Sequence, residues 1–240
     1  TSVTFFAYYL GALWNGAWLS ADMSRVTCDS AQMIEACAYF AGLVVRDRVA
    51  ATVADLEAAF GDASAERAFL TGGLATYATP GAQNVAAVAE GLRARGLPLA
   101  YAPLPAFKTF GAPHYYIGNG IVTGARHPDE GWAYVKWAAS TPNWAITRGQ
   151  PPARVDLFDA WAARAYEGIG DRVRLEVYRD SLRHPLRLDP LFHVPAAERV
   201  QMVDLIQVGL DRMWRGDAPA QVLRELKGQL QPLVPRELPG

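Results

Sequence analysis

The sequence has almost no net charge, few cysteines and no long apolar run, and each of these absences excludes a class of protein. The formal net charge of the 240-residue chain is -1 at pH 7, so it lacks the basic surface that binds nucleic acid or an anionic membrane. No apolar run approaches the roughly 20 residues that a membrane-spanning helix needs. The hydrophobic fraction of 51% is enough to build a buried core, which excludes a disordered chain.

Motifs for metal binding and catalysis are also lacking. The two cysteines, Cys28 and Cys37, have neither zinc-site nor CxxC spacing. Cys37 falls in an apolar helical stretch, which favours a buried thiol, although a disulfide stays open. There is no H-E-x-x-H and no G-x-S-x-G motif. We therefore expect no metal, no cofactor and no catalytic residue, while scattered carboxylates leave a small glycoside hydrolase as the alternative.

Helical patterns dominate the chain, with short extended segments in its first half. Asp29 and Gln32 form a capping-box pattern that predicts a helix start, and Pro128 suits the first position of a helix. Further helices are predicted over residues 65–70, 81–95, 129–139, 141–146, 157–166, 171–178, 196–214 and 218–230. Extended segments are predicted at 74–78, 99–105, 115–117 and 121–123. Strands mixed with many helices predict an α/β fold.

Two groups of residues could contact a ligand. Six aromatic residues gather near the start of the chain, where they could form a core stripe or a platform that stacks on sugar rings. They are Phe5, Phe6, Tyr8, Tyr9, Trp14 and Trp18. The second group is the glycine run from Gly118 to Gly124. No helix opens at these glycines, so a dinucleotide site is disfavoured, and close approach of the backbone to a neighbour or a ligand is the better explanation.

Eight short motifs follow one another in an order that is typical of one family. They are Asn15-Gly16, Val26-Thr27-Cys28-Asp29-Ser30, Phe69–Ala75, Tyr101-Ala102-Pro103-Leu104-Pro105, Tyr116–Val122, His127–Trp132, Gly149–Arg154 and Arg215-Gly216-Asp217. In this order they resemble the family 1 extracellular solute-binding proteins, the sugar-binding proteins of ABC transporters that include maltose-binding protein. The resemblance extends over almost the whole chain and corresponds to the C-terminal portion of the family.

The resemblance implies a periplasmic-binding-protein-like (type II) two-lobe α/β fold. Residues 1–115 would be the first segment of the C-terminal lobe, 116–156 would cross into the N-terminal lobe, and 157–240 would return as a helical tail. Most of the N-terminal lobe would be missing. The start of the chain has no initiator Met and no signal-peptide pattern, so we expect it to begin within a longer protein or after processing.

The resemblance also implies a ligand site. Its residues would be Phe5, Tyr8, Gln83, Tyr116, Gly118, Asn119 and Arg154. Phe5 and Tyr8 would stack on the ligand, and Gln83 would offer a hydrogen bond where the family commonly has a stacking Trp. Tyr116, Gly118 and Asn119 would lie on a strand that approaches the ligand. Arg154 would donate to hydroxyls or a carboxylate, or else form a surface or interlobe salt bridge.

The function that follows is recognition without chemistry. A monomeric binding protein would close around a carbohydrate or similar small polar solute and deliver it to the permease subunits of an ABC importer. The place would be extracytoplasmic, either the periplasm or the outer surface as a lipoprotein. Besides the hydrolase, the sequence leaves a helical interaction module without a small ligand as a second rival.

Overall fold

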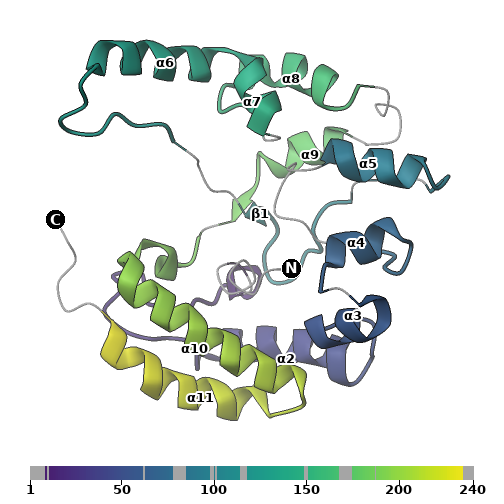
Figure 1. Cartoon of the computed structure of the whole chain (residues 1–240). Coiled ribbons are helices and arrows are strands. Elements are labelled where there is room, and N and C mark those ends of the chain that lie inside the picture. The colour runs from purple at the N-terminus through teal and green to yellow at the C-terminus, as the bar shows by residue number, and fades with distance from the viewer. Residues whose placement is uncertain are drawn as a thin grey trace. The chain divides into compact units, whose positions relative to one another are not determined.

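The computed structural model shows helices joined by irregular segments (Figure 1). It describes residues 9, 11–61, 63–77, 85–97, 100, 102–113, 118–148, 151–167, 175–186 and 188–234. The chain divides into two compact units, each assembled from separate segments. Unit 1 comprises Thr1–Ala65, Leu104–His114 and Ser181–Gly240, and unit 2 comprises Glu66–Pro103 and Tyr115–Asp180. The assignment of residues 1–115, 116–156 and 157–240 to the lobes of a binding protein stays a prediction.

Three helices form the centre of unit 1. They are α2 (Ala31–Val45), α10 (Ala196–Trp214) and α11 (Pro219–Leu230), which lie side by side in Figure 1. The buried residues of α10 recur at helical spacing, namely Met202, Ile206, Gly209, Leu210 and Met213. They therefore form one apolar stripe along the helix, and the helix predicted over 196–214 is confirmed.

A glycine allows α10 and α11 to pack closely. A Cβ atom placed on Gly209 would come within 2.4 Å of Leu226 Cδ1 of α11. That distance is shorter than real carbon contacts, so a larger residue at 209 would force Leu226 out of its position. The core that the two helices share also includes Trp18 and Leu19 from the first segment of the chain.

The start of α2 corrects the predicted helix cap. Ser30 occupies the N-cap position, where its hydroxyl accepts a hydrogen bond from the Met33 backbone N–H at 3.4 Å. The prediction of Asp29 was wrong by one residue. The carboxylate of Asp29 instead accepts hydrogen bonds from the ammonium group of Lys227 in α11. Asp29, which the local pattern predicted to cap the helix, therefore forms a tertiary ion pair with Lys227 instead.

Helix α3 (Val53–Phe60) is an element that the sequence analysis missed. It begins with a capping box, in which the Asp55 backbone N–H donates to Thr52 and the Asp55 carboxylate accepts from the Thr52 backbone N–H. It ends at Gly61, whose φ of +67° suits a residue without a side chain. Thr52 and Asp55 are three residues apart, so the capping pattern was visible in the sequence.

Replacing Thr52 by alanine should loosen α3 alone. The Asp55 N–H would lose its acceptor, which typically costs about 1 kcal/mol, or roughly a fivefold change in the opening equilibrium. Hydrogen exchange of the amides in 53–60 should accelerate by about that factor. Thr52→Ser keeps the hydroxyl and should exchange like the wild type. Equal exchange in the alanine variant would show that the capping box does not stabilise this helix.

Short helices make up the regular structure described in unit 2 and at its boundaries. They are α4 (Ala65–Leu70), α5 (Val85–Arg93), α6 (Pro128–Ser140), α7 (Pro142–Arg148), η2 (Val155–Leu157), α8 (Phe158–Ala165) and α9 (Leu175–Ser181). The predicted start at Pro128 is confirmed, and Asp129 and Glu130 in the first turn of α6 favour the positive end of the helix dipole. A cluster of buried residues joins α7 and α8: Ala145, Phe158, Trp161, Ala162 and Tyr166.

Strands are fewer than the sequence predicted, although the helix-rich chain is still α/β. In the described part of the chain, β1 (Ala112–Pro113) pairs in parallel with β2 (Pro185–Leu186). Leu19 and Val26 also form an isolated antiparallel bridge. The predictions of strands at 74–78, 99–105 and 121–123 were wrong for the residues that are described. Apolar and β-branched residues suit a strand only where a neighbouring strand is present to pair with them, and these segments have no such pairing. Residues 115–117 lie outside the described part.

Candidate functional site

Four of the residues predicted to bind the ligand lie outside the described part of the chain. They are Phe5, Tyr8, Gln83 and Tyr116. The structure does place the other three, Gly118, Asn119 and Arg154. All three belong to unit 2 and are exposed.

Gly118 and Asn119 lie in an irregular segment that leads to α6. Their backbone is not part of a strand, so the predicted strand setting was wrong for these two residues. A Cβ atom on Gly118 would meet nothing within 4 Å, so no side chain or backbone presses against it. The proposed ligand contact of this segment stays a prediction.

Arg154 forms an ion pair on the surface of unit 2. Its Nε lies 3.0 Å from Asp156 Oδ1 and its Nη2 lies 2.5 Å from Asp156 Oδ2. These hydrogen bonds lower the pKa of Asp156 and raise that of Arg154. The structure therefore contains the surface salt bridge that the sequence left open. A ligand group that binds this guanidinium would have to compete with Asp156.

The aromatic residues near the start of the chain divide into core residues and residues outside the described part. Tyr9, Trp14 and Trp18 are all buried in unit 1. Of the two explanations left open for the aromatic residues, a core stripe and a sugar-stacking platform, core packing therefore accounts for these three rings.

An aromatic cluster in unit 1 reaches the surface from Trp14. We call Trp14, Tyr39, Phe40 and Phe107 the Trp14 cluster. The rings of Trp14 and Phe107 stack with centroids 4.2 Å apart, and that of Tyr39 lies 5.4 Å from Trp14. Trp14 is buried, whereas Tyr39 is 43% exposed. The cluster thus exposes the Tyr39 ring, which carries a hydroxyl group, to solvent, while the buried ring of Trp14 supports it from below.

Charged groups lie beside the Trp14 cluster. Lys108 Nζ is 3.1 Å from Glu35 Oε1, and both side chains are mostly exposed. Glu35 is one helical turn before Tyr39 in α2, while Lys108 follows Phe107. The backbone N–H of Lys108 donates to the Leu13 carbonyl at 3.0 Å, which ties this segment to η1 (Gly11–Trp14). An exposed ring with a cation and a carboxylate nearby matches the chemistry of a polar ligand.

The sequence analysis missed this surface. Glu35 and Tyr39 share a helix face, and their spacing could have been noticed. The approach of Phe107 to Trp14 joins distant segments, and no local pattern encodes it.

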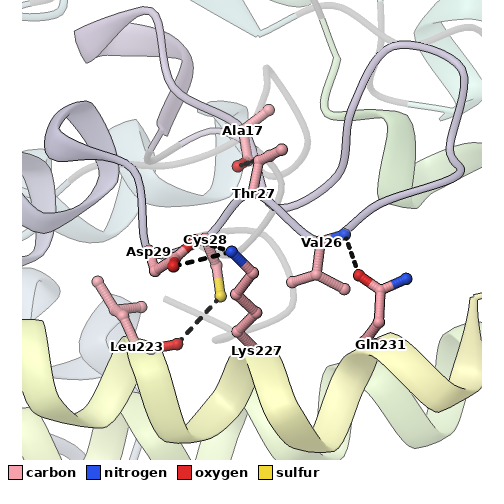
Figure 2. A network of polar contacts seen from close by, with 8 residues as sticks. All are labelled: Ala17, Val26, Thr27, Cys28, Asp29, Leu223, Lys227 and Gln231. Atoms are coloured by element: carbon pink, nitrogen blue, oxygen red, sulfur yellow. Dashed lines mark hydrogen bonds and ion pairs between the residues drawn. The ribbon is translucent and has the colours of Figure 1, made fainter.

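The segment before α2 is held against α11 by polar contacts (Figure 2). Lys227 Nζ donates to both oxygens of Asp29, each at 2.9 Å. The thiol of Cys28 donates to the Leu223 carbonyl at 3.3 Å. Because these contacts connect residues about 200 positions apart, they fix the first segment of the chain against the last long helix.

Two further contacts complete this network. The Val26 backbone N–H donates to Gln231 Oε1 at 2.9 Å, and the Thr27 hydroxyl donates to the Ala17 carbonyl at 2.7 Å. Residues 17–29 therefore form a rigid support immediately after the aromatic start of the chain. A binding residue works best on such a support, because less conformational entropy is lost when the ligand arrives.

Both cysteines are free, buried thiols. Burial raises the pKa of Cys28 and of Cys37 to about 12. Both thiols are therefore protonated at neutral pH and act as small apolar groups rather than as nucleophiles. The disulfide that the sequence left open is not formed.

Asp189 is a buried acid that joins distant segments of unit 1. Its Oδ2 accepts from the Trp18 backbone N–H at 2.7 Å, and its Oδ1 accepts from that of Leu191 at 3.0 Å. It also caps η4 (Pro190–His193). Burial raises the pKa of Asp189 to about 7, although the backbone N–H groups favour its charged form. Asp189 has a scaffold role, because both oxygens are turned to backbone donors.

The residues that the structure describes contain neither a metal-binding cluster nor a membrane-spanning helix. Within these ranges, no group of three or more His, Cys, Asp or Glu side chains is arranged to hold a metal ion. The described helices include none with the length and apolar character to cross a bilayer.

Comparison with known proteins identifies the fold. Neither a protein-family model nor a curated protein matches the sequence. Among solved structures, an ABC substrate-binding protein from Listeria monocytogenes in complex with cycloalternan matches 97% of this chain, with a TM-score of 0.67 and 15% sequence identity. The match covers 57% of that protein, so this chain spans little more than half its length. The predicted resemblance to solute-binding proteins is thereby confirmed at the level of the fold.

Proposed function

We propose that the chain is the substrate-binding component of an ABC importer. It binds a carbohydrate or a similar small polar solute outside the cytoplasm and delivers it to permease subunits in the membrane. The observation that carries this proposal is the fold match over 97% of the chain to a substrate-binding protein. That protein was solved with cycloalternan, which favours a carbohydrate ligand here.

In this proposal the ligand is recognised by stacking and hydrogen bonding, without catalysis. Phe5 and Tyr8 stack on apolar faces of the sugar rings. Tyr39, with Glu35 and Lys108 beside it, extends this surface and satisfies hydroxyl groups. The buried base of the Trp14 cluster supports the role of Tyr39, because it holds the ring without a cost in side-chain freedom at binding.

The remaining predicted residues belong to segments that would meet the ligand when the protein closes. Gln83, Tyr116, Gly118 and Asn119 supply polar and backbone contacts. When ligand binds, the Arg154 guanidinium leaves the Asp156 carboxylate and donates hydrogen bonds to an oxygen of the ligand instead. Ligand stabilises the closed state, which then docks on the permease.

Calorimetric titration against monosaccharides and oligosaccharides, including cycloalternan, tests the proposal. We expect saturable binding of at least one sugar, with the sugar recovered unchanged. Failure to bind any member of a broad panel of polar solutes would contradict the proposal. Turnover of a glycoside that is lost when one acidic residue is replaced would instead favour a hydrolase.

Replacing Tyr8 by alanine should weaken ligand binding by about 10- to 100-fold, because a stacked aromatic ring contributes roughly 1.5–3 kcal/mol when it is buried against its partner. The measurement is the calorimetric Kd of the sugar found above. Phe60→Ala is the matched control, since this aromatic side chain of α3 is partly exposed and lies outside the proposed site. An unchanged Kd for the Tyr8 variant would remove Tyr8 from the site.

A further inference from the structure

The chain contains two Asn-Gly pairs, Asn15-Gly16 and Asn119-Gly120. Asn is a thermolabile residue, and it loses its side-chain amide most readily when Gly follows it. The reason is steric, because the backbone nitrogen of a residue without a Cβ atom is open to close approach by the Asn side chain. The two pairs have the same sequence, so a difference in their reactivity must come from the folded structure.

The reaction uses atoms of the chain itself and water. The Gly backbone nitrogen gives its proton to a base in solvent and bonds to the side-chain carbonyl carbon of Asn. The bond from that carbon to the amide nitrogen breaks, and ammonia leaves with a proton taken from solvent. Water then opens the resulting cyclic imide at either of its carbonyls, which gives aspartate or isoaspartate. The net change is water consumed and ammonia released, and no oxidant or reductant is needed.

The Asn119-Gly120 pair is open to this reaction. Both residues are exposed in the irregular segment before α6. A Cβ atom on Gly120 would meet nothing within 4 Å, so no neighbouring group blocks approach to its backbone. Within the described part of the chain, neither residue donates or accepts a hydrogen bond. The Asn119 side chain can therefore turn toward the Gly120 nitrogen without breaking a contact.

The Asn15-Gly16 pair is held in place. The Gly16 N–H donates to the Gly11 carbonyl at 2.8 Å, so this nitrogen has to give up a hydrogen bond before it can attack. A Cβ atom on Gly16 would come within 3.1 Å of Met33 Cγ and Sδ in α2, which shows that the backbone packs against this helix. The reaction at Asn15 therefore requires local opening of the fold.

A third described asparagine, Asn143 in α7, is protected in another way. Trp144 follows it, and the bulk of that residue hinders approach to the backbone nitrogen. The Asn143 side-chain oxygen also accepts a hydrogen bond from Arg164 Nη1 at 2.8 Å. Among the asparagines that the structure describes, Asn119 therefore combines the reactive sequence with an open setting.

We propose that Asn119 is a site of spontaneous deamidation and isoaspartate formation, and that the fold protects Asn15 from the same reaction. Each event adds a negative charge to a chain whose formal net charge is -1, and isoaspartate also inserts a methylene group into the main chain. Both changes fall in the segment where Gly118 and Asn119 are proposed to contact the ligand. That consequence rests on the proposed function, whereas the reaction does not.

Peptide mapping by mass spectrometry during incubation at mildly alkaline pH tests the proposal. Trypsin cuts after Arg25, Lys108 and Arg126, so Asn15 and Asn119 fall in separate peptides that contain no other Asn. We expect Asn119 to convert at least about tenfold faster than Asn15 in the folded chain, because only Asn15 needs local opening. In urea the two sites should convert at rates within about twofold of each other. An isoaspartate-specific carboxyl methyltransferase should label the Asn119 peptide of the folded chain.

Two substitutions distinguish attack by the Gly120 nitrogen from direct hydrolysis of the amide. Gly120→Val places a β-branched side chain beside the attacking nitrogen, and it should slow conversion at Asn119 by at least about tenfold. Gly118→Val is the matched control, because it adds the same side chain before Asn119 and should leave the rate nearly unchanged. Both glycines have open space around the Cβ position, so the circular dichroism of both variants should equal that of the wild type.

Three results would overturn the proposal. One is equal conversion of Asn15 and Asn119 in the folded chain. Another is conversion of both sites in urea with no conversion of Asn119 in the folded chain, since the fold would then protect the exposed pair as well. The third is an unchanged rate in Gly120→Val, since the amide would then be lost without the cyclic imide. None of these measurements involves a sugar, so their failure would leave the proposed function untouched.

Discussion

Asp189→Ala is expected to lower the free energy of unfolding by about 2–4 kcal/mol. The Trp18 and Leu191 N–H groups, which donate to this carboxyl at 2.7 and 3.0 Å, would remain buried without an acceptor. Each buried donor left in this way costs roughly 1–3 kcal/mol. The loss should be visible as a lower midpoint in urea unfolding at pH 6. Leu188, the residue before Asp189, is only partly buried against the core, so the Leu188→Ala control should cost less.

The same residue should make stability depend on pH. Because burial raises the pKa of Asp189 from 3.8 to about 7, the folded state binds more protons than the unfolded state between these values. Stability from this group is therefore fully present below about pH 4 and is lost as pH rises through 7. The shift corresponds to a total on the order of 4 kcal/mol.

Asp189→Asn isolates this contribution, because the amide does not titrate while keeping one acceptor oxygen. Unfolding measured from pH 5 to pH 8 should show a falling free energy for the wild type and a flatter profile for the variant. Parallel profiles would contradict a raised pKa at Asp189 and would leave its role as a hydrogen-bond anchor intact.

The helices could be predicted where their determinants are local. The helix predicted over 196–214 is present, and its buried residues Met202, Ile206, Leu210 and Met213 recur at helical spacing, a local pattern that favours the element. Pro128 fixed the start of α6 in the same way. The N-cap of α2 was misplaced because Asp29 pairs with Lys227, a partner far along the chain. A sequence pattern describes near neighbours and does not contain that competition.

The predictions of strands were wrong because a strand, unlike a helix, depends on residues that are distant in the sequence. A strand is stabilised by its neighbours in a sheet, and the composition of a segment such as 121–123 does not say whether a neighbour exists. The Trp14 cluster and the contact between Trp18 and Asp189 also depend on segments that meet only in the folded chain. By contrast, the local alternative for Arg154, a salt bridge, could be anticipated because Asp156 is two residues away.

The resemblance predicted the fold more successfully than the residue patterns did. Order and spacing of motifs reflect the whole chain, so they carry long-range information that periodicity lacks. The seven proposed ligand residues were selected by that resemblance, although the aromatic and glycine patterns alone had already made Phe5, Tyr8 and Gly118 candidates. Their roles accordingly depend on the binding measurements above.

Trp161→Ala is expected to unfold part of unit 2 while leaving unit 1 folded. Trp161 is fully buried and contacts Phe158 and Tyr166, with ring centroids 5.5 and 5.7 Å away. Replacing a buried Trp by Ala typically costs about 3–5 kcal/mol. The core described here consists of five residues, so it has few other contacts to compensate. Unit 1 has a separate core built on α2, α10 and α11.

Hydrogen exchange by mass spectrometry resolves the two units in one experiment. A loss of 3 kcal/mol corresponds to an increase of about 150-fold in local opening, so amides of α7 and α8 should exchange that much faster in Trp161→Ala. Amides of α10 and α11 should keep their wild-type rates. Trp137→Ala is the matched control, because the ring it removes is half exposed and surface changes usually stay within 0.5 kcal/mol. Faster exchange in α10 and α11 as well would mean that the two units unfold as one cooperative body, since the loss of one core would then have released the other.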